Sequence, residues 1–148
     1  MRISLLVVSL VLLSALLTMS LAQSQPSAKG GRAPVAGLMG DVAHGRYLVE
    51  QVAMCFECHS PRDGRGNIIE SQRYLGAPIP FSPPWPNDWA LIAPRNRGLP
   101  DYDDAAAMRL LTQGAIARDG RQLKSPMPKF HMTPQDAADV IAFMRSLE

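Results

Sequence analysis

The sequence contains few of the residues that bind structural metals or form stabilising cross-links. Among its 148 residues, two are cysteines and three are histidines. A structural zinc site needs about four ligands, but beyond Cys55, Cys58 and His59 only the distant His44 and His131 remain, without paired spacing. A disulfide between Cys55 and Cys58 would close a very short loop and add little stability. Neither a zinc site nor a plain disulfide therefore explains the two cysteines.

An excess of charge of one sign is also missing. The formal net charge is +2, and removing residues 1–22, whose one charged side chain is Arg2, leaves +2 − 1 = +1. No cluster of lysines and arginines alternates with aromatic residues. A basic stripe for nucleic acid and a patch for an anionic membrane surface are therefore not predicted.

Runs that alternate as β-strands and internal repeats are absent too, which predicts an all-α domain. Helices are expected over three segments, residues 41–55, residues 103 or 104 to about 112, and residues 133–147. The last has the clearest start, with Thr133 as N-cap, Pro134 at the first helical position and Asp136 in the first turn. Since no strand–helix alternation surrounds the cysteines, a thiol oxidoreductase is not favoured either.

The N-terminus does contain a long apolar run. Arg2, the apolar residues that follow and the small-residue site Ser20-Leu21-Ala22 are typical of a secretory signal over residues 1–22. The alternative is an uncleaved anchor in the inner membrane, because residues 3–22 carry no charge and are about long enough to span a bilayer. Both interpretations predict export to the periplasm. Residues 23–40, rich in Gly, Ala, Pro and Ser, are interpreted as a flexible linker.

The remaining domain, residues 41–148, has too few helical apolar residues to form a core by itself. Residues 60–100 hold most of the 13 prolines and read as one long wrapped loop. A loop of that length counts against a compact domain unless something else occupies its centre. The pattern of three or four short helices and long loops therefore predicts a large apolar ligand as part of the core.

The stretch "CFECHS" at residues 55–60 indicates how that ligand is held. On one helical turn, positions i, i+3 and i+4 share a face, so Cys55, Cys58 and His59 point the same way. Thioether bonds from both thiols to the vinyl groups of a haem would fix the porphyrin, and His59 would then reach the iron. The motif predicts one covalent haem c.

The sequence resembles the class I c-type cytochromes, and in particular the haem domains in cytochrome subunits of bacterial alcohol and sugar dehydrogenases. The likeness runs through "GRYLVEQVAMCFECHSPRDGRG", "LIAPRN" and "LLTQGAIARDGRQLKSPMPKFHMTPQDAADVIAFMRSL". It implies an α-helical cytochrome c fold in which the first and last helices cross, with haem between them and electron transfer as the activity. Relatives often carry three such domains, whereas this chain has one.

The sixth iron ligand is expected to be Met127. It lies between two prolines in "SPMPKF", where the backbone is stiff and cannot continue a helix. Met108 and Met144 occupy apolar helix positions, where methionine is usually core filler. Met132 and, after it, His131 remain as alternatives. In the family that the sequence resembles, the ligand methionine sits in the matching "PMP".

A haem iron held by His59 and Met127 is saturated, so no catalytic residue is expected. We expect a one-electron carrier in a periplasmic respiratory or dehydrogenase-linked chain, with redox proteins as partners: a dehydrogenase as donor and an oxidase or another cytochrome as acceptor. One alternative is a haem subunit stably docked on a periplasmic dehydrogenase. Another is a haem enzyme or gas sensor with an open iron position, which Met127 argues against.

Further hypotheses concern residues around the haem. Gly45 and Phe143 match the family's close helix crossing, and His44 is expected at the surface. Pro78 is the candidate carbonyl partner for the second ring nitrogen of His59. Candidate donors to the haem propionates lie in the middle loop, namely Tyr74, Trp85, Trp89, Arg95 and Arg97.

Four cations lie close in sequence to the two expected ligand segments. Arg62 and Arg65 come after the cysteine motif, and Lys124 and Lys129 flank Met127, with Asp63 as the one acidic residue among them. They suggest a local positive rim that orients an acidic partner and raises the association rate more than the affinity.

Overall fold

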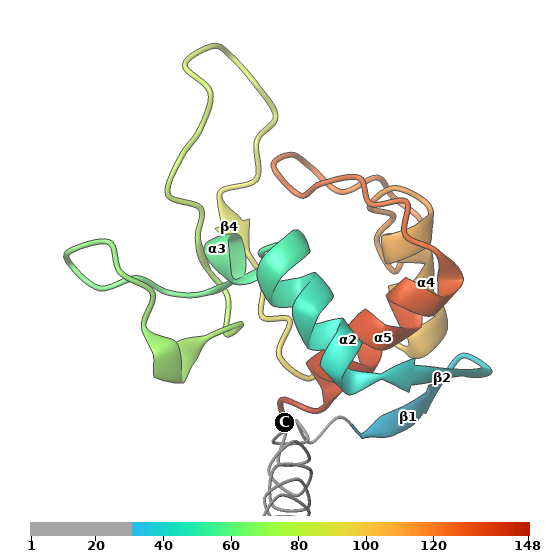
Figure 1. Cartoon of the computed structure of the whole chain (residues 1–148). Coiled ribbons are helices and arrows are strands. Elements are labelled where there is room, and N and C mark those ends of the chain that lie inside the picture. Colours follow the sequence, from blue (N-terminus) through green and yellow to red (C-terminus); the bar gives the residue numbers. More distant parts are fainter. Residues whose placement is uncertain (1–30) are drawn as a thin grey trace, which may run out of the picture.

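A computed structural model describes residues 31–148 of the chain (Figure 1). In chain order the elements are β1 (Arg32–Val35), β2 (Leu38–Asp41), α2 (Val42–Tyr47), the π-helical turn η1 (Leu48–Val52), α3 (Phe56–His59), the 3-10 turn η2 (Glu70–Gln72), β3 (Ala77–Pro78), β4 (Ile92–Ala93), α4 (Asp104–Thr112) and α5 (Pro134–Arg145). The predicted helical core with long loops is confirmed. None of the described helices is long and apolar enough to cross a bilayer, and the predicted signal or anchor over residues 1–22 lies outside the described residues.

The first and last helices cross in close contact. α2 runs directly into η1, and α5 passes across them (Figure 1). At the crossing Gly45 is buried, and a Cβ atom added to it would lie 1.9 Å from the Asp139 carbonyl oxygen and 2.9 Å from the Phe143 Cβ. The predicted pairing of Gly45 with Phe143 is confirmed, because only a residue without a side chain fits at this approach.

The three main helices begin where their sequences predicted. In each case the side chain of the cap, Asp41, Asp103 or Thr133, accepts a hydrogen bond from a backbone N–H of the first turn. Pro134 follows Thr133 at the start of α5. These caps satisfy N–H groups that have no partner inside the helix, and so they set the helix boundaries.

The expectation of a flexible linker over residues 23–40 is wrong for its second half. There the chain forms the antiparallel hairpin β1–β2, which lies against α5 (Figure 1). Val35 is buried in the core, and a Cβ atom on Gly40 would lie 2.5 Å from the Ala138 carbonyl oxygen of α5. The strands are short and carry no alternating pattern, so the hairpin owes its place to packing on α5 rather than to its own sequence.

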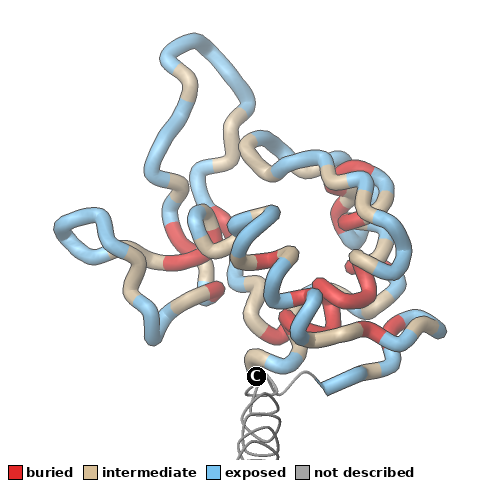
Figure 2. Tube along the Cα trace, in the orientation of Figure 1, coloured by how far each residue is buried: buried red, intermediate tan, exposed pale blue. Residues whose placement is uncertain are grey.

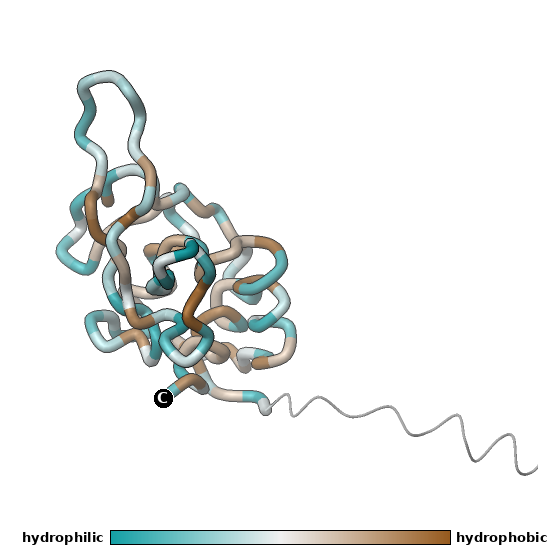
Figure 3. Tube along the Cα trace, turned by 90° about the vertical axis from the view of Figure 1, so that its left-hand side faces the viewer, coloured by the Kyte–Doolittle hydropathy of each residue, from teal (hydrophilic) through white to brown (hydrophobic). Residues whose placement is uncertain are grey.

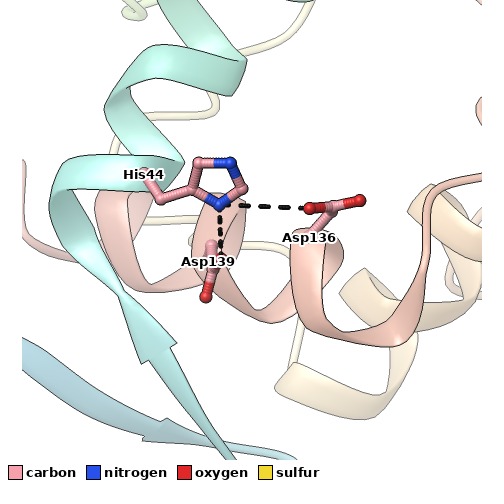
Figure 4. Close-up of side chains that lie close together, drawn as sticks. All are labelled: His44, Asp136 and Asp139. Carbon is pink, nitrogen blue, oxygen red and sulfur yellow. Dashed lines mark hydrogen bonds and ion pairs between the residues drawn. The ribbon is translucent and has the colours of Figure 1, made fainter.

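A buried carboxylate ties the hairpin, α2 and α5 together (Figure 4). One oxygen of Asp139 accepts from the Asp41 backbone N–H at 2.7 Å and from Gln135 Nε2 at 2.8 Å, and the other lies 2.7 Å from His44 Nδ1. Burial pushes the pKa of Asp139 upward, but these hydrogen bonds outweigh it and hold the pKa below its ordinary value. The bond to Asp139 raises the pKa of His44, whose side chain is 46% exposed, as expected for a residue at the surface.

Residues 60–100 form loops, as predicted, with one minimal sheet among them. β3 and β4 pair through Ala77 with Ala93 and Pro78 with Ile92. The loop between these strands, residues 79–91, projects from the body and is called the finger below (Figure 1). It is exposed along most of its length (Figure 2), and hydrophobic segments lie at its base (Figure 3).

The core is concentrated around α5 rather than spread through the molecule (Figure 2). Every residue from Ala137 to Met144 is buried. Val49 of η1, Tyr74 and Leu111 of α4 belong to the same hydrophobic cluster. The loops on the side of α3 and the finger contribute few buried residues, which leaves them dependent on something other than this cluster.

We expect Gly45→Ala to destabilise the protein by roughly 1–3 kcal/mol, because the added methyl group must displace the backbone of α5. The higher helix propensity of alanine, worth about 1 kcal/mol, does not compensate for that displacement. Urea unfolding followed by circular dichroism measures the change. Gly64→Ala is the control, since a Cβ atom there meets nothing within 4 Å; equal stabilities of the two variants would show that the crossing tolerates a side chain.

Candidate functional site

The two cysteines and His59 follow a break in the first helix. In η1 the Ala53 N–H donates to the Leu48 carbonyl at 2.8 Å, which is a π-type bond, and Met54 then adopts a left-handed φ of 46°. The chain restarts as α3, where the His59 N–H donates to the Cys55 carbonyl at 3.1 Å. Such π-turns are frequent at functional sites, and this one redirects the chain just before the motif.

Cys55, Cys58 and His59 face one cavity, as their spacing predicted. No disulfide joins the cysteines. Burial raises the pKa of the Cys55 thiol to about 11 and also raises the pKa of Cys58, so both thiols are protonated at neutral pH. A redox or zinc-binding cysteine acts as a thiolate, which neither environment favours.

His59 is held in one orientation. The residue is 8% exposed, and its Nδ1 donates to the Pro94 carbonyl oxygen at 2.7 Å. Burial lowers the pKa of His59, and the bond to Pro94 opposes that shift only in part. The imidazole is therefore neutral with its proton on Nδ1, which leaves the Nε2 lone pair for a metal.

The hypothesis that Pro78 is the carbonyl partner of His59 is wrong. Pro78 lies in β3, whereas Pro94 directly follows β4, the strand that pairs with it. The segment before Pro78 binds the backbone instead, with the Gly76 N–H donating to the His59 carbonyl at 2.9 Å. The residues next to both strands of this small sheet thus hold His59: Gly76, before β3, bonds its backbone, and Pro94, after β4, bonds its ring.

The cavity has a volume of about 550 Å³ and a mainly apolar lining. Its walls come from α3, the finger, α4, α5 and the loop that carries Met127. All four residues predicted to hold a haem line it: Cys55, Cys58, His59 and Met127. Its size lies within the range of pockets that enclose cofactors, so the residues present fit a large apolar prosthetic group.

Four methionines line the cavity, and three have other roles. Met144 is buried in α5, and Met132 packs against the core cluster. Met54 is 52% exposed and adjoins Cys55, on the side of the motif. Met127 is half-buried, lies outside the core cluster and comes from a loop on the far side of the molecule from α3 (Figure 1).

Polar groups for acidic substituents of such a group are also present. Arg95 and Asn96 line the cavity; the Arg95 guanidinium can donate to a carboxylate, whereas the buried Asn96 Oδ1, which has no hydrogen-bond partner among the described residues, is an acceptor. The buried Trp89 Nε1 also has no partner among the described residues, but Trp89 does not line the cavity. Of the other suggested donors, Tyr74 packs edge-on against Phe143 in the core and Trp85 is 64% exposed, and neither lines the cavity.

The polar cluster at the helix crossing is a separate feature. The ligating atoms of His44, Asp136 and Asp139 lie within 4.8 Å of one another (Figure 4). Both oxygens of Asp139 already accept hydrogen bonds from the hairpin, α2 and α5. The contacts of the cluster are thus those of a structural clamp between helices.

Two comparisons with known proteins agree with this geometry. Residues 42–148 match the family described as "Cytochrome c". A "Diheme cytochrome c-type" protein of Cereibacter sphaeroides is 38% identical over 81 residues, which cover 45% of this chain and 27% of that protein. The chain thus spans about a quarter of the length of that relative. The family match covers most of the chain and agrees with the helical fold and the Cys-x-x-Cys-His turn described above. The chain therefore belongs to the cytochrome c family, as an electron-transfer protein with covalently attached haem c.

Proposed function

We propose that this chain carries a single haem c, bound through thioethers to Cys55 and Cys58 and ligated by His59 and Met127. It would serve as a one-electron carrier in a periplasmic respiratory or dehydrogenase-linked chain. The observation that carries the proposal is the convergence of these four side chains, from two separate segments, on one apolar cavity. A single pair of cysteines supports one haem in this chain.

The haem, when bound, supplies a reversible one-electron iron couple, and the residues tune and protect it. The bond from His59 Nδ1 to Pro94 fixes the ring and raises the basicity of Nε2. A thioether from Met127 favours the ferrous state, and the apolar lining keeps water out. If His59 and Met127 both bind the iron, no position would be left for a substrate, which supports electron transfer as the role.

The periplasmic setting is supported by residues 1–22, whose pattern is that of an export signal. Cleavage after Ala22 would release the carrier, and retention would tether it to the inner membrane. Intact mass and fractionation distinguish the two forms.

A permanent place on a periplasmic dehydrogenase is the second candidate. The finger favours it, since Trp85 is 64% and Leu91 75% exposed, and apolar side chains in a projecting loop are typical of contact surfaces. Copurification of a dehydrogenase with the native protein at high salt would favour the docked subunit. Recovery of the chain alone would favour the freestanding carrier.

The positive rim takes a smaller form than expected. Arg62 pairs with Glu57, and Lys124 pairs with Asp88. Arg65 and Lys129 form no ion pair within residues 31–148. We therefore assign the steering of an acidic partner to these two cations.

Met127→Ala should leave the haem attached but remove its sixth ligand. We expect a potential lower by on the order of 0.1 V, since axial-ligand choice spans about 0.8 V across haem proteins, and rapid binding of carbon monoxide to the reduced protein. Met39→Ala is the control, because Met39 lies in β2 and does not line the cavity. An unchanged spectrum and potential in Met127→Ala would transfer the assignment to Met132.

Replacement of Cys55 and Cys58 by alanine should abolish covalent haem and, with it, folding. At about 24 cal/mol per Å³, leaving the 550 Å³ cavity unfilled costs at most about 13 kcal/mol, as much as the whole stability of a typical domain, about 5–15 kcal/mol. Intact mass reports attachment, and far-ultraviolet circular dichroism reports helicity. A variant without haem but with native helicity would contradict the role of the ligand as core.

Charge reversal tests the rim. Lys129→Glu should slow electron transfer to the native partner at low salt, and the effect should fade as the ionic strength passes about 0.1 M, where the Debye length is about 10 Å. Arg32→Glu makes the same change of charge on the hairpin, away from the finger (Figure 1), and serves as control. Equal rates for both variants at every salt concentration would leave an apolar contact as the mode of docking.

A further inference from the structure

The loop that carries Met127 is hydrogen-bonded at its two ends to the segment that follows α4. On one side the Leu123 N–H donates to the Ala115 carbonyl at 2.9 Å. On the other, the Gly114 N–H donates to the Phe130 carbonyl at 2.9 Å. The residues between these anchors, 124–129, are called the Met127 segment.

Within the described residues, the hydrogen bonds of the Met127 segment itself go to the finger. The Ala90 N–H donates to the Ser125 carbonyl at 2.7 Å. Beside it, the Lys124 ammonium pairs with the Asp88 carboxylate, and both side chains line the cavity. One backbone bond and one exposed ion pair therefore hold the start of this segment, directly before Pro126 and Met127, against the finger.

The finger is organised well enough to act as a support. Its base is closed by a bond from the Ile79 N–H to the Leu91 carbonyl at 2.9 Å. Near its tip, Asn87 accepts from the Trp89 N–H at 2.9 Å. The ring of Trp89 also meets Phe81 edge-on, with 6.1 Å between ring centres. These contacts fix the backbone on both sides of Ala90.

The same stretch of chain reaches His59. Four residues after Ala90, the Pro94 carbonyl accepts the His59 Nδ1 proton at 2.7 Å. Residues 90–94, called the axial strap here, include β4 and its pairing with β3. The axial strap is thus hydrogen-bonded at one end to the Met127 segment and at the other to His59.

We propose that Ala90 and Asp88 are positioning residues that hold Met127 at the haem, and that the axial strap couples the placement of both axial ligands. The inference rests on the proposed function, since it takes Met127 as the sixth ligand. The strap touches neither the metal nor a substrate. It acts by limiting how far the Met127 segment moves away, and so sets how often the sixth position opens.

Ala90→Pro removes the N–H donor at a position outside any helix or strand. In the haem-loaded protein we expect carbon monoxide to bind the reduced form about 2- to 13-fold faster, the change that corresponds to the loss of one net hydrogen bond. In the oxidised form the sulfur-to-iron charge-transfer absorption should weaken. Ala90→Gly keeps the donor and is the matched control, expected to bind carbon monoxide at the rate of the unmodified protein.

Asp88→Asn breaks the ion pair and leaves the backbone intact, so it covers the case in which Ala90→Pro fails to fold. We expect a smaller acceleration, about 1.5- to 5-fold, because exposed ion pairs contribute little, and it should vanish at high salt. Asp119→Asn is its control, since Asp119 also forms an exposed ion pair, with Arg121, and does not line the cavity. Equal acceleration of carbon monoxide binding by Asp88→Asn and Asp119→Asn would show that the loss of one negative charge is enough, and it would overturn the inference.

The two proposals fail in different ways. If Met127→Ala leaves the spectrum and the carbon monoxide rate unchanged, Met127 is not the ligand and the proposed function is wrong at that residue. If Met127→Ala opens the site but Ala90→Pro and Asp88→Asn keep the original rate, the ligand stands and the strap is refuted. If the strap acts through Met127, adding Ala90→Pro to Met127→Ala changes the rate no further; an additional increase would overturn it.

Discussion

The loops of this cytochrome depend on what fills the space between them. Its cluster of buried side chains is built around α5, and the finger and the Met127 segment stand around a cavity of about 550 Å³ rather than against that cluster, whereas α3 lines the cavity and also packs on the cluster through Phe56. Loops of this length gain too little from their own contacts to offset the entropy of ordering them. A covalently attached haem supplies apolar surface to all of them at once, so prosthetic group and fold form one thermodynamic unit.

The crossing of α2 and α5 is the part of the molecule that least needs the haem. Gly45 lets the helix backbones meet, and Asp139 satisfies the hairpin, α2 and its own helix through both oxygens. A wider spacing between α2 and α5 would also separate Asp139 from its hydrogen-bond donors in the hairpin and in α2, and so leave a buried carboxylate unpaired. The helix crossing therefore relies on close backbone packing and on the hydrogen bonds of Asp139, whereas the loops around the cavity rely on burial of the haem.

Local rules predicted the features that local rules determine. The capping residues Asp41 and Thr133 predicted where two helices begin. The spacing of Cys55, Cys58 and His59 predicted that they share a face, and the small number of apolar core residues predicted a cavity. The hairpin β1–β2 escaped because its strands are short and are held by α5, a partner about a hundred residues away.

Hydrogen bonds between loops could not be predicted from the sequence for a related reason. Pro94 rather than Pro78 receives the His59 proton, because the pairing of β3 with β4 brings two prolines to neighbouring places and composition does not rank them. The bond between Ala90 and Ser125 joins two backbone groups, so no residue type marks it. The choice of Met127 over Met132 came from the stiffness of its flanking prolines, and the core packing of Met132 adds a second argument for it.

The hairpin and the C-terminus leave the body at the end away from the finger (Figure 1). Attachment through the hairpin or through residues near the C-terminus would therefore keep the finger side of the haem cavity turned to solution. On an electrode, a protein coupled through its C-terminus would present that side to dissolved partners while electrons cross the length of the body. Coupling through the finger itself would reverse this orientation, so the two immobilised forms would separate electrode-facing from solution-facing electron transfer in one and the same protein.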